Sequence, residues 1–202
     1  LKGYDTDGRA NAGAAKALKA RVHLYQQEYQ DAYDLADEVI LNGPYSLADN
    51  YISIFDYETP FPEESIFEVD FSQQDGNELA FWYFEDDLGG RYEYGVTGSL
   101  VKAYEEGDQR FAAIEYYPQT ARYMINKYQD VGSGSDNVIV LRLAEMYLIR
   151  AEATINGARG STPAIHDVNA IRQRAGLSNL SGDVNLEIIL DERRKELAFE
   201  GH

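Results

Sequence analysis

The chain has 202 residues, of which 44% are hydrophobic, and this length is enough for one domain with a well-buried core. Aspartate and glutamate number 35 against 18 lysines and arginines, so the formal charge of −17 argues against a polyanion such as nucleic acid as a partner. The absence of cysteine excludes disulfides, thiol nucleophiles and thiolate metal sites within these residues. No run approaches the ~20 consecutive apolar residues that a membrane-spanning helix needs.

The two ends do not look like natural termini. The chain starts at Leu1 without the basic start and apolar core of a signal peptide, and it stops at His202. We therefore expect residues 1–202 to be a single-domain fragment of a larger chain.

A helical hairpin is expected over residues 10–42, because apolar residues recur there at three- and four-residue steps in two runs. The first run consists of Ala14, Leu18, Val22 and Tyr25. The second run consists of Ala32, Leu35, Ala36, Val39 and Ile40. Gly43 follows at a position where a left-handed residue would end the helix, and Pro44 prevents the helix from resuming.

Residues 43–136 are expected to form an irregular, loop-rich region with short strands. Residues 65–71 alternate between apolar and polar side chains, which predicts a half-buried strand. Residues 98–111 predict a short helix that ends at Gly107, with Asp108 and Arg110 placed to pair at its exit. Between these two segments lies a loop with six aromatic residues: Phe81, Trp82, Tyr83, Phe84, Tyr92 and Tyr94.

This aromatic loop is the strongest candidate for a binding site. Sugars present apolar C–H faces ringed by hydroxyl groups, so a sugar site combines flat aromatic rings with polar side chains that bond the hydroxyls. A single ring in such a loop is more often structural than ligand-contacting, so the prediction depends on the cluster as a whole. The predicted glycan site consists of Trp82, Tyr83, Asp86, Arg91, Tyr92 and Tyr94.

A second helical hairpin and a following helix are expected over residues 137–202. Asn137 is a candidate cap for a helix with the apolar stripe Val138, Leu141, Ala144, Leu148, Ala151 and Ile155. Asn156 and Gly157 end this helix, Pro163 opens the next, and a last helix begins near Asn185. Together the patterns predict a mainly α fold of tetratricopeptide-like hairpins separated by a long irregular insertion.

The charged segment near the end of the chain has the residue types of an active site, namely Glu192, Arg193, Arg194, Lys195, Glu196 and Glu200. However, several of these residues are helical neighbours four apart, as on any charged helix face. We therefore interpret the segment as structural and predict that Arg193 pairs with a carboxylate such as Glu145 or Glu152.

No metal site and no cofactor are expected. The three histidines, His23, His166 and His202, do not have the spacing of metal ligands. Glycoside hydrolysis would need two positioned carboxylates, and this acidic chain supplies many candidates without favouring any pair. Those nearest the aromatic loop are Glu78, Glu85, Asp86, Asp87 and Glu93.

Four segments together resemble the SusD/RagB family of outer-membrane lipoproteins: residues 98–111, Lys127 with Tyr128 as a strand, residues 137–153, and residues 192–201. Lys102 stands where the family usually has aspartate, and no proline precedes Thr97. The resemblance, which spans Gly8 to Gly201, implies a SusD-like α/α superhelix and non-catalytic capture of oligosaccharides or polysaccharides. It also implies delivery to a TonB-dependent, SusC-like transporter and a cell-surface location, with a lipid anchor outside these residues.

Three functions therefore remain as hypotheses. The favoured one is glycan binding for uptake without catalysis. The alternatives are a helical-repeat module that binds another protein, which is compatible with the first, and a glycoside hydrolase that uses two carboxylates of the middle region.

Overall fold

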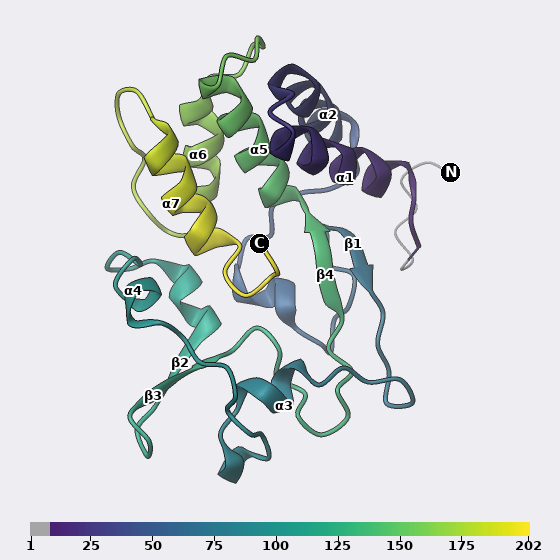
Figure 1. Cartoon of the computed structure of the whole chain (residues 1–202), viewed down its shortest axis with the longest axis vertical. Coiled ribbons are helices and arrows are strands. Elements are labelled where there is room, and N and C mark those ends of the chain that lie inside the picture. Colours follow the sequence, from purple (N-terminus) through teal and green to yellow (C-terminus); the bar gives the residue numbers. More distant parts are fainter. Residues whose placement is uncertain (1–8) are drawn as a thin grey trace.

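A computed structural model describes residues 9–202, so the start of the family resemblance at Gly8 lies outside the described residues. The helical lobe is built from α1 (Ala12–Tyr25), α2 (Tyr29–Asn42), α5 (Leu143–Ile155), α6 (Ala164–Arg174) and α7 (Leu186–Glu196), and lies above an irregular lobe (Figure 1). This arrangement confirms the predicted mainly α fold with tetratricopeptide-like hairpins. No helix within residues 9–202 is long and apolar enough to cross a membrane.

The irregular lobe contains α3 (Leu79–Tyr83), α4 (Gly98–Val101) and an antiparallel hairpin of β2 (Ile114–Tyr117) and β3 (Arg122–Ile125). Three short 3-10 helices, η1 (Ile52–Phe55), η2 (Asp86–Leu88) and η3 (Gln109–Ala113), complete the region between the helical groups. A second antiparallel pair, β1 (Ser65–Val69) with β4 (Val138–Arg142), connects the two lobes (Figure 1).

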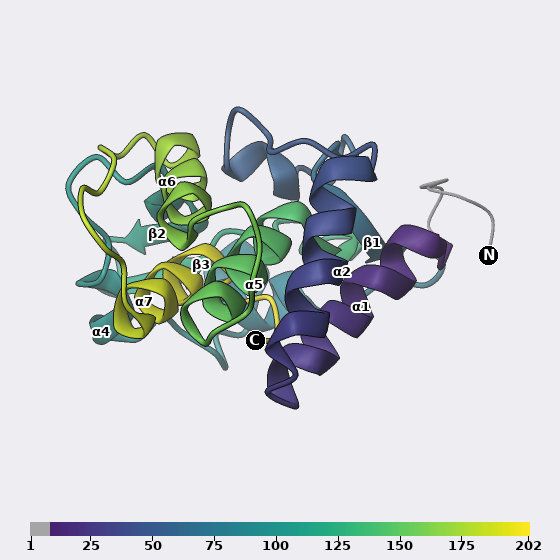
Figure 2. The same cartoon turned by 90° about the horizontal axis from the view of Figure 1, so that it is seen from above.

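Small residues set the spacing of the helices. Seen from above, α1, α2, α5 and α6 follow one another across the molecule (Figure 2), and each packs against the next. The helix contacts are lined by completely buried alanines: Ala17 and Ala20 of α1, Ala32 and Ala36 of α2, and Ala153 of α5. Because an alanine side chain ends at Cβ, the backbones approach closely and the core is dense.

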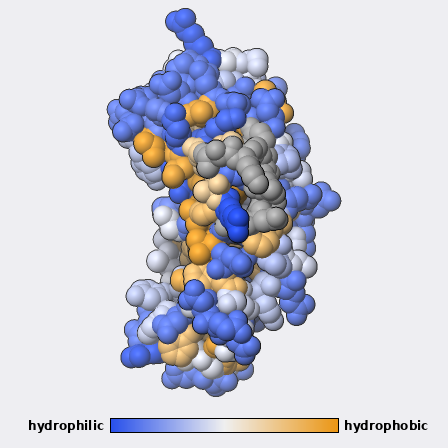
Figure 3. Space-filling view, turned by 90° about the vertical axis from the view of Figure 1, so that its right-hand side faces the viewer, coloured by the Kyte–Doolittle hydropathy of each residue, from blue (hydrophilic) through white to orange (hydrophobic). Residues whose placement is uncertain are grey.

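The predicted stripe of α1 was wrong for its three larger members. The buried face of α1 carries Ala14, Ala17, Ala20 and Leu24 instead. Leu18, Val22 and Tyr25 remain 48%, 44% and 72% exposed. The side of the molecule that carries α1 and β1 shows a band of hydrophobic residues through its middle (Figure 3). The close approach of α1 to α2 explains the outcome, since it leaves room for alanine and turns the larger side chains outward.

Gly43 follows α2 as predicted, but its role differs from the prediction. Its backbone is extended, with φ −75° and ψ 157°, rather than left-handed. A Cβ at this position would overlap the carbonyl oxygen of Val39 and the ring of Tyr45. Glycine is therefore required here by the close approach of the chain to Tyr45 and not by its φ angle.

The helix predicted from Val138 begins at Leu143, because residues 138–142 form strand β4. The run Val138, Ile139, Val140 is β-branched and suits a strand better than the first turn of a helix. Asn137 is not a helix cap, since its side chain accepts from the Phe71 N–H at 2.9 Å and donates to Glu68 Oε1 at 2.8 Å. The buried face of this strand carries Ile139 and Leu141, whereas Val138, a member of the predicted stripe, is only half-buried.

The remaining boundaries were predicted with mixed success. Gly157 ends α5 in a left-handed conformation with φ 101°, and Asn185 caps α7 by accepting from the Ile188 N–H at 2.9 Å. Two expectations were wrong. β3 ends at Ile125, so Lys127 and Tyr128 are buried outside a strand, and α4 ends at Val101 rather than at Gly107.

A buried cluster of ion pairs holds the irregular lobe to the helices. Arg142, at the β4–α5 junction, donates to Glu64 at 2.7 Å, to Glu196 at 2.5 Å and to Glu200 at 2.7 Å. Arg174 of α6 pairs with Glu64 and Glu196. Each of these five side chains is at most 4% exposed, so the α5, α6 and α7 segments meet on one charged, dehydrated contact.

The irregular lobe joins this cluster through Arg110 and Lys127. Arg110 donates to Asp108 at 2.9 Å, as predicted, and its Nη1 lies 2.5 Å from Glu192 of α7. Burial lowers the pKa of Lys127 to about 8, although its partner Glu200 opposes that shift. The lobe that carries the aromatic residues is therefore fixed in place by charges that water does not reach.

Candidate functional site

The first half of the predicted aromatic loop is a short helix. In α3, the Trp82 N–H donates to the Glu78 carbonyl at 3.1 Å and the Phe84 N–H donates to the Ala80 carbonyl at 3.0 Å. Among the five residues of α3, only Ala80 is buried, at 1% exposure. The rings of Phe81, Trp82 and Tyr83 are each half-buried around this anchor and keep part of their surface open.

The chain then turns and runs back along α3. The Arg91 N–H donates to the Phe81 carbonyl at 2.8 Å, and the Glu93 N–H donates to the Trp82 carbonyl at 2.9 Å. Gly90 permits the turn, because a Cβ there would overlap the backbone of Phe84. These hydrogen bonds place residues 91–94 beside the aromatic residues of α3.

Trp82 has two neighbours that fix its ring. The Phe81 and Trp82 rings pack edge to face, with their centroids 5.0 Å apart. The guanidinium carbon of Arg91 lies 5.6 Å from the centroid of the Trp82 ring. Arg91 is itself held by Glu93, with Nε 2.8 Å from Oε1, and its side chain is 60% exposed. A cation beside an indole ring at an exposed position is worth about 0.5–1 kcal/mol, so this contact orients the ring without burying it.

Tyr83 and Tyr94 form a second aromatic pair of the predicted site. Their ring centroids are 6.5 Å apart in an edge-to-face arrangement, and Tyr94 is 62% exposed. Burial raises the pKa of Tyr83, whose ring also contacts Tyr128 at 6.1 Å. The structure thus brings Trp82, Tyr83, Arg91 and Tyr94 together through one helix and one returning segment.

The other two predicted site residues lie apart from this group. Tyr92 faces the β2–β3 hairpin, where its hydroxyl donates to the Tyr123 carbonyl at 3.1 Å and the guanidinium of Arg122 lies 4.8 Å from its ring. Asp86 is exposed at the start of η2, and its carboxylate has no hydrogen-bond partner among the described residues. Tyr92 therefore anchors the loop, whereas Asp86 remains open to solvent.

Most carboxylates of the region brace the loop. Glu85 is buried and accepts from the Thr120 hydroxyl at 2.6 Å. Asp87 accepts from the Tyr117 hydroxyl, and this hydrogen bond raises the pKa of Tyr117 to about 12. With Glu93 paired to Arg91, three of the five carboxylates considered for hydrolysis already hold other side chains.

The charged residues of α7 are structural, but they do not form an ordinary exposed helix face. Glu192, Lys195 and Glu196 are buried, at 1%, 2% and 0% exposure. The expected partner of Arg193 is confirmed, since its Nη2 lies 3.2 Å from Glu152. Arg193 does not need Glu145, which pairs with Arg21 of α1.

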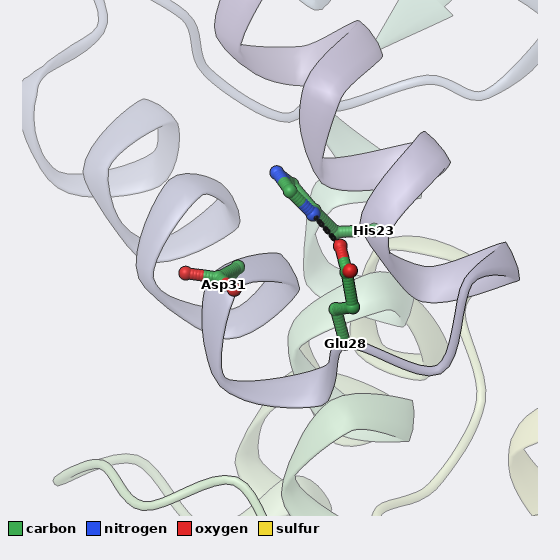
Figure 4. Close-up of side chains that lie close together, drawn as sticks. All are labelled: His23, Glu28 and Asp31. Atoms are coloured by element: carbon green, nitrogen blue, oxygen red, sulfur yellow. Dashed lines mark hydrogen bonds and ion pairs between the residues drawn. The ribbon is translucent and has the colours of Figure 1, made fainter.

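One histidine comes close to two carboxylates in space. His23, at the end of α1, points toward Glu28 in the turn, with Nδ1 2.5 Å from Oε2, and Asp31 lies beside them on the first turn of α2 (Figure 4). The spacing of the histidines alone did not predict this group. The α1–α2 turn explains it, because the Glu28 N–H also donates to the His23 carbonyl at 2.9 Å. Both carboxylates are exposed, and exposed acidic groups commonly lie close together without holding an ion, so we assign no metal to this group.

Comparison with known proteins places this architecture. Residues 81–202, which include the aromatic residues of α3, the returning segment and all of the second helical group, match the model of the SusD family. The chain belongs to the SusD family. A SusD-like protein of Formosa agariphila is 24% identical over an alignment that covers 96% of this chain and 49% of that protein.

Solved structures of SusD-like proteins have the same fold. A laminarin-binding SusD-like protein superimposes with a TM-score of 0.84 at 29% identity, covering 97% of this chain and 54% of that one. Surface glycan-binding protein A from Bacteroides fluxus has a TM-score of 0.84 at 27% identity, covering 98% of this chain and 52% of that one. This SusD family chain therefore spans about half the length of the relatives that it matches.

The sequence did not predict the residues of the β2–β3 hairpin that contact the segment carrying the aromatic residues. Tyr117, Thr120 and Arg122 of the β2–β3 hairpin contact Asp87, Glu85 and Tyr92. These contacts join segments about 30 residues apart in the sequence, and the periodicity of hydrophobic residues, which is a local pattern, cannot predict them. Only the aromatic and β-branched residues of segments 114–117 and 122–125, which flank a short polar turn, could have indicated a hairpin there.

Proposed function

We propose that this chain is the glycan-binding part of a cell-surface SusD family protein and that it binds its ligand without catalysis. The observation that carries the proposal is the half-buried indole ring of Trp82, oriented by Phe81 and Arg91 on the same lobe as the open Tyr94 ring. Flat rings beside polar groups match the alternation of C–H faces and hydroxyls on a sugar. A relative named for laminarin binding, at 29% identity, supports the same ligand class.

The proposed mechanism is capture followed by release. The Trp82 and Tyr94 rings stack on sugar faces, Arg91 donates to hydroxyl groups, and the open site keeps the affinity modest. Release then passes the glycan to a TonB-dependent, SusC-like transporter in the outer membrane. A lipid anchor outside these residues would hold the protein at the cell surface.

Binding without hydrolysis is favoured by the state of the nearby carboxylates. A glycosidase places two carboxyl groups across the scissile bond, one as acid and one as base or nucleophile. Here Glu85, Asp87 and Glu93 are engaged by a hydroxyl or a guanidinium of the protein, which leaves Glu78 and Asp86 as the exposed carboxylates without such partners.

A second candidate function, binding of another protein, is favoured by the outward face of α1. Leu18, Val22 and Tyr25 lie at helical spacing and are 44–72% exposed, and Leu41 of α2 is 68% exposed. A contiguous exposed apolar face is typical of a protein contact. This role is compatible with glycan binding, because α1 and α3 belong to different lobes (Figure 1).

The proposal is tested by affinity electrophoresis of the chain through gels that contain soluble plant, host and microbial polysaccharides. The same mixtures are assayed for released reducing sugar. We expect retardation by one class of polysaccharide and no released sugar. Released reducing sugar would show a hydrolase, and migration unaffected by every polysaccharide would contradict glycan binding.

A further inference from the structure

A hollow of about 250 Å³ opens beside the aromatic helix, between segment 76–81 and loop 130–134. Phe81, whose ring contacts Trp82, forms part of its wall. Sites for drug-sized ligands measure about 300–1,000 Å³, so this hollow suits one sugar ring rather than an oligosaccharide.

Close backbone contacts hold the two walls of the hollow together. The Asn77 N–H donates to the Gly134 carbonyl at 2.9 Å, and its side-chain amide donates to the Asp136 carbonyl at 2.5 Å. A Cβ at Gly76 would overlap the Ser133 carbonyl, and a Cβ at Gly134 would overlap that of Asn77. The hollow therefore has a fixed shape, which reduces the entropy lost when a ligand binds.

The far wall is organised by Asp130. Its carboxylate accepts the N–H groups of Ser133 and Ser135, each at 2.9 Å, and both serine hydroxyls. Burial favours a raised pKa for Asp130, but these hydrogen bonds reverse the shift and hold the pKa well below its usual range. Asp130 therefore stays ionised, and its oxygens are already occupied by the loop itself.

Other groups around the hollow remain open to a ligand. Glu78 is exposed, and its carboxylate has no hydrogen bond or ion pair within residues 9–202. The backbone groups of Gly76 and Gly132 make no backbone hydrogen bond in that part of the chain. No lysine or arginine among residues 9–202 lines the hollow. The walls thus offer an apolar ring, an acceptor carboxylate and free peptide groups, and no cation.

A larger hollow of about 400 Å³ between α7 and segment 95–100 is a weaker candidate for a sugar. Leu100, Leu190 and Leu197 contribute to its lining. Its two arginines are already engaged, Arg193 with Glu152 at 3.2 Å and Arg194 with the Ser99 hydroxyl at 2.8 Å. A sugar in this hollow would bury hydroxyl groups with few partners, which is costly.

We propose that the hollow beside Phe81 is a subsite for one uncharged sugar ring, adjoining the Trp82 face, and that the ligand is a neutral glycan. This inference rests on the proposed glycan-binding function. Glu78 accepts hydrogen bonds from hydroxyl groups, and the Phe81 ring contacts a C–H face. A carboxylate or sulfate on the ring in this hollow would instead meet Glu78 and the ionised Asp130, and none of the described residues that line the hollow is a lysine or arginine that could offset the repulsion.

The test measures the affinity of the full chain for neutral polysaccharides (laminarin, a mannan and a xyloglucan) and for anionic ones (alginate and a carrageenan). Gly132→Phe places a bulky side chain at the hollow. Among the described residues, the one atom within 4 Å of an added Cβ at Gly132 is Asp130 Oδ1 at 3.7 Å, so the substitution starts without a clash against the backbone. Gly98→Phe is the matched control, since Gly98 has open space around it and lies outside the hollow. Glu78→Ala tests the free carboxylate without adding bulk.

We expect the wild-type chain and Gly98→Phe to bind a neutral polysaccharide with equal affinity. Neither should bind the anionic polysaccharides. Gly132→Phe and Glu78→Ala should each bind the neutral ligand about tenfold more weakly, with unchanged circular dichroism. If both variants bind like the wild type while Trp82→Ala loses binding, the subsite is wrong and the proposed function stands. If the wild-type chain bound an anionic polysaccharide more tightly than any neutral one, the assignment of a neutral glycan would be overturned. If the wild-type chain bound none of the polysaccharides, the proposed function itself would be overturned.

Discussion

Trp82 is the residue on which the proposed glycan recognition depends most. Its ring is held from one side by Phe81 and approached by Arg91, yet the side chain remains half-buried rather than enclosed. An aromatic ring contributes contact area with little conformational entropy to lose, so it binds a flat sugar face efficiently.

Trp82→Ala should weaken glycan binding by about tenfold or more, equivalent to ~1.4 kcal/mol, while leaving the fold intact. The measurement is the dissociation constant from affinity electrophoresis, with circular dichroism as the check on folding. Tyr25→Ala is a matched control, because Tyr25 is an aromatic residue 72% exposed on α1 in the other lobe. Equal affinities for wild type and Trp82→Ala, at full helicity, would remove Trp82 from the site.

At the scale of single elements, α5 is the central helix of the fold. It packs against α1, α2, α6 and α7, and Leu148 on it is completely buried with Ala144, Ile171 and Leu197. Truncation there leaves a cavity that the surrounding helices fill only in part.

Leu148→Ala should lower the free energy of unfolding by ~2–5 kcal/mol, as measured by urea denaturation. The control is Leu18→Ala on α1, where the side chain is 48% exposed and the expected change stays within about 0.5 kcal/mol. A large loss for Leu18→Ala, or none for Leu148→Ala, would contradict this assignment of core and surface.

The same two leucines show what the sequence could and could not predict. A three- and four-residue period locates a helix reliably, and α1, α2, α6 and α7 lie where the period predicted them. The period does not say which of two faces is buried when one carries alanines and the other leucines. That choice depends on how closely the partner helix approaches, and α2 brings its own Ala32 and Ala36 to the contact.

For the candidate site, the sequence predicted the segment but not its contacts, as it predicted the helices but not their buried faces. Aromatic clustering located the segment that folds into α3, but its pairing with residues 91–94 and its support from β2 and β3 come from contacts between distant segments. Glu78 stood out only as one of five carboxylates near the aromatic loop, and Gly132 gave no signal, because an exposed glutamate and a loop glycine are common in any acidic chain. Their relevance appears only when the hollow beside Phe81 is seen.

At the scale of the molecule, the two lobes are joined by buried charges. Burial favours a raised pKa for Glu196, but the guanidinium groups of Arg174, Arg142 and Arg110 reverse the shift and hold that pKa well below its usual range. The pKa of Glu200 is likewise lowered, because Arg142 and Lys127 outweigh the effect of burial. At the edge of the cluster, a hydrogen bond from Arg172 lowers the pKa of Glu105 to about 2.

These shifts predict that the protein loses stability in acid. A carboxylate whose pKa is lower in the folded state stabilises the fold fully above its unfolded pKa of about 4.5, and this contribution is lost as the pH falls through the folded pKa. We therefore expect the free energy of unfolding to decline below about pH 5. Glu105→Gln should flatten this decline, whereas Glu58→Gln, at an exposed position, should not. A stability profile unchanged from neutral pH to pH 3 would show that the cluster is not ionised as described.

The central claim, that the α3 face binds a glycan, is tested most directly by the fluorescence of Trp82, the single tryptophan of the chain. Titration with a polysaccharide that retards the chain in a gel should change the emission of Trp82 in a saturable way. The change should follow the same dissociation constant as the retardation. Retardation without any change in Trp82 emission would place the glycan elsewhere on the molecule and contradict the account.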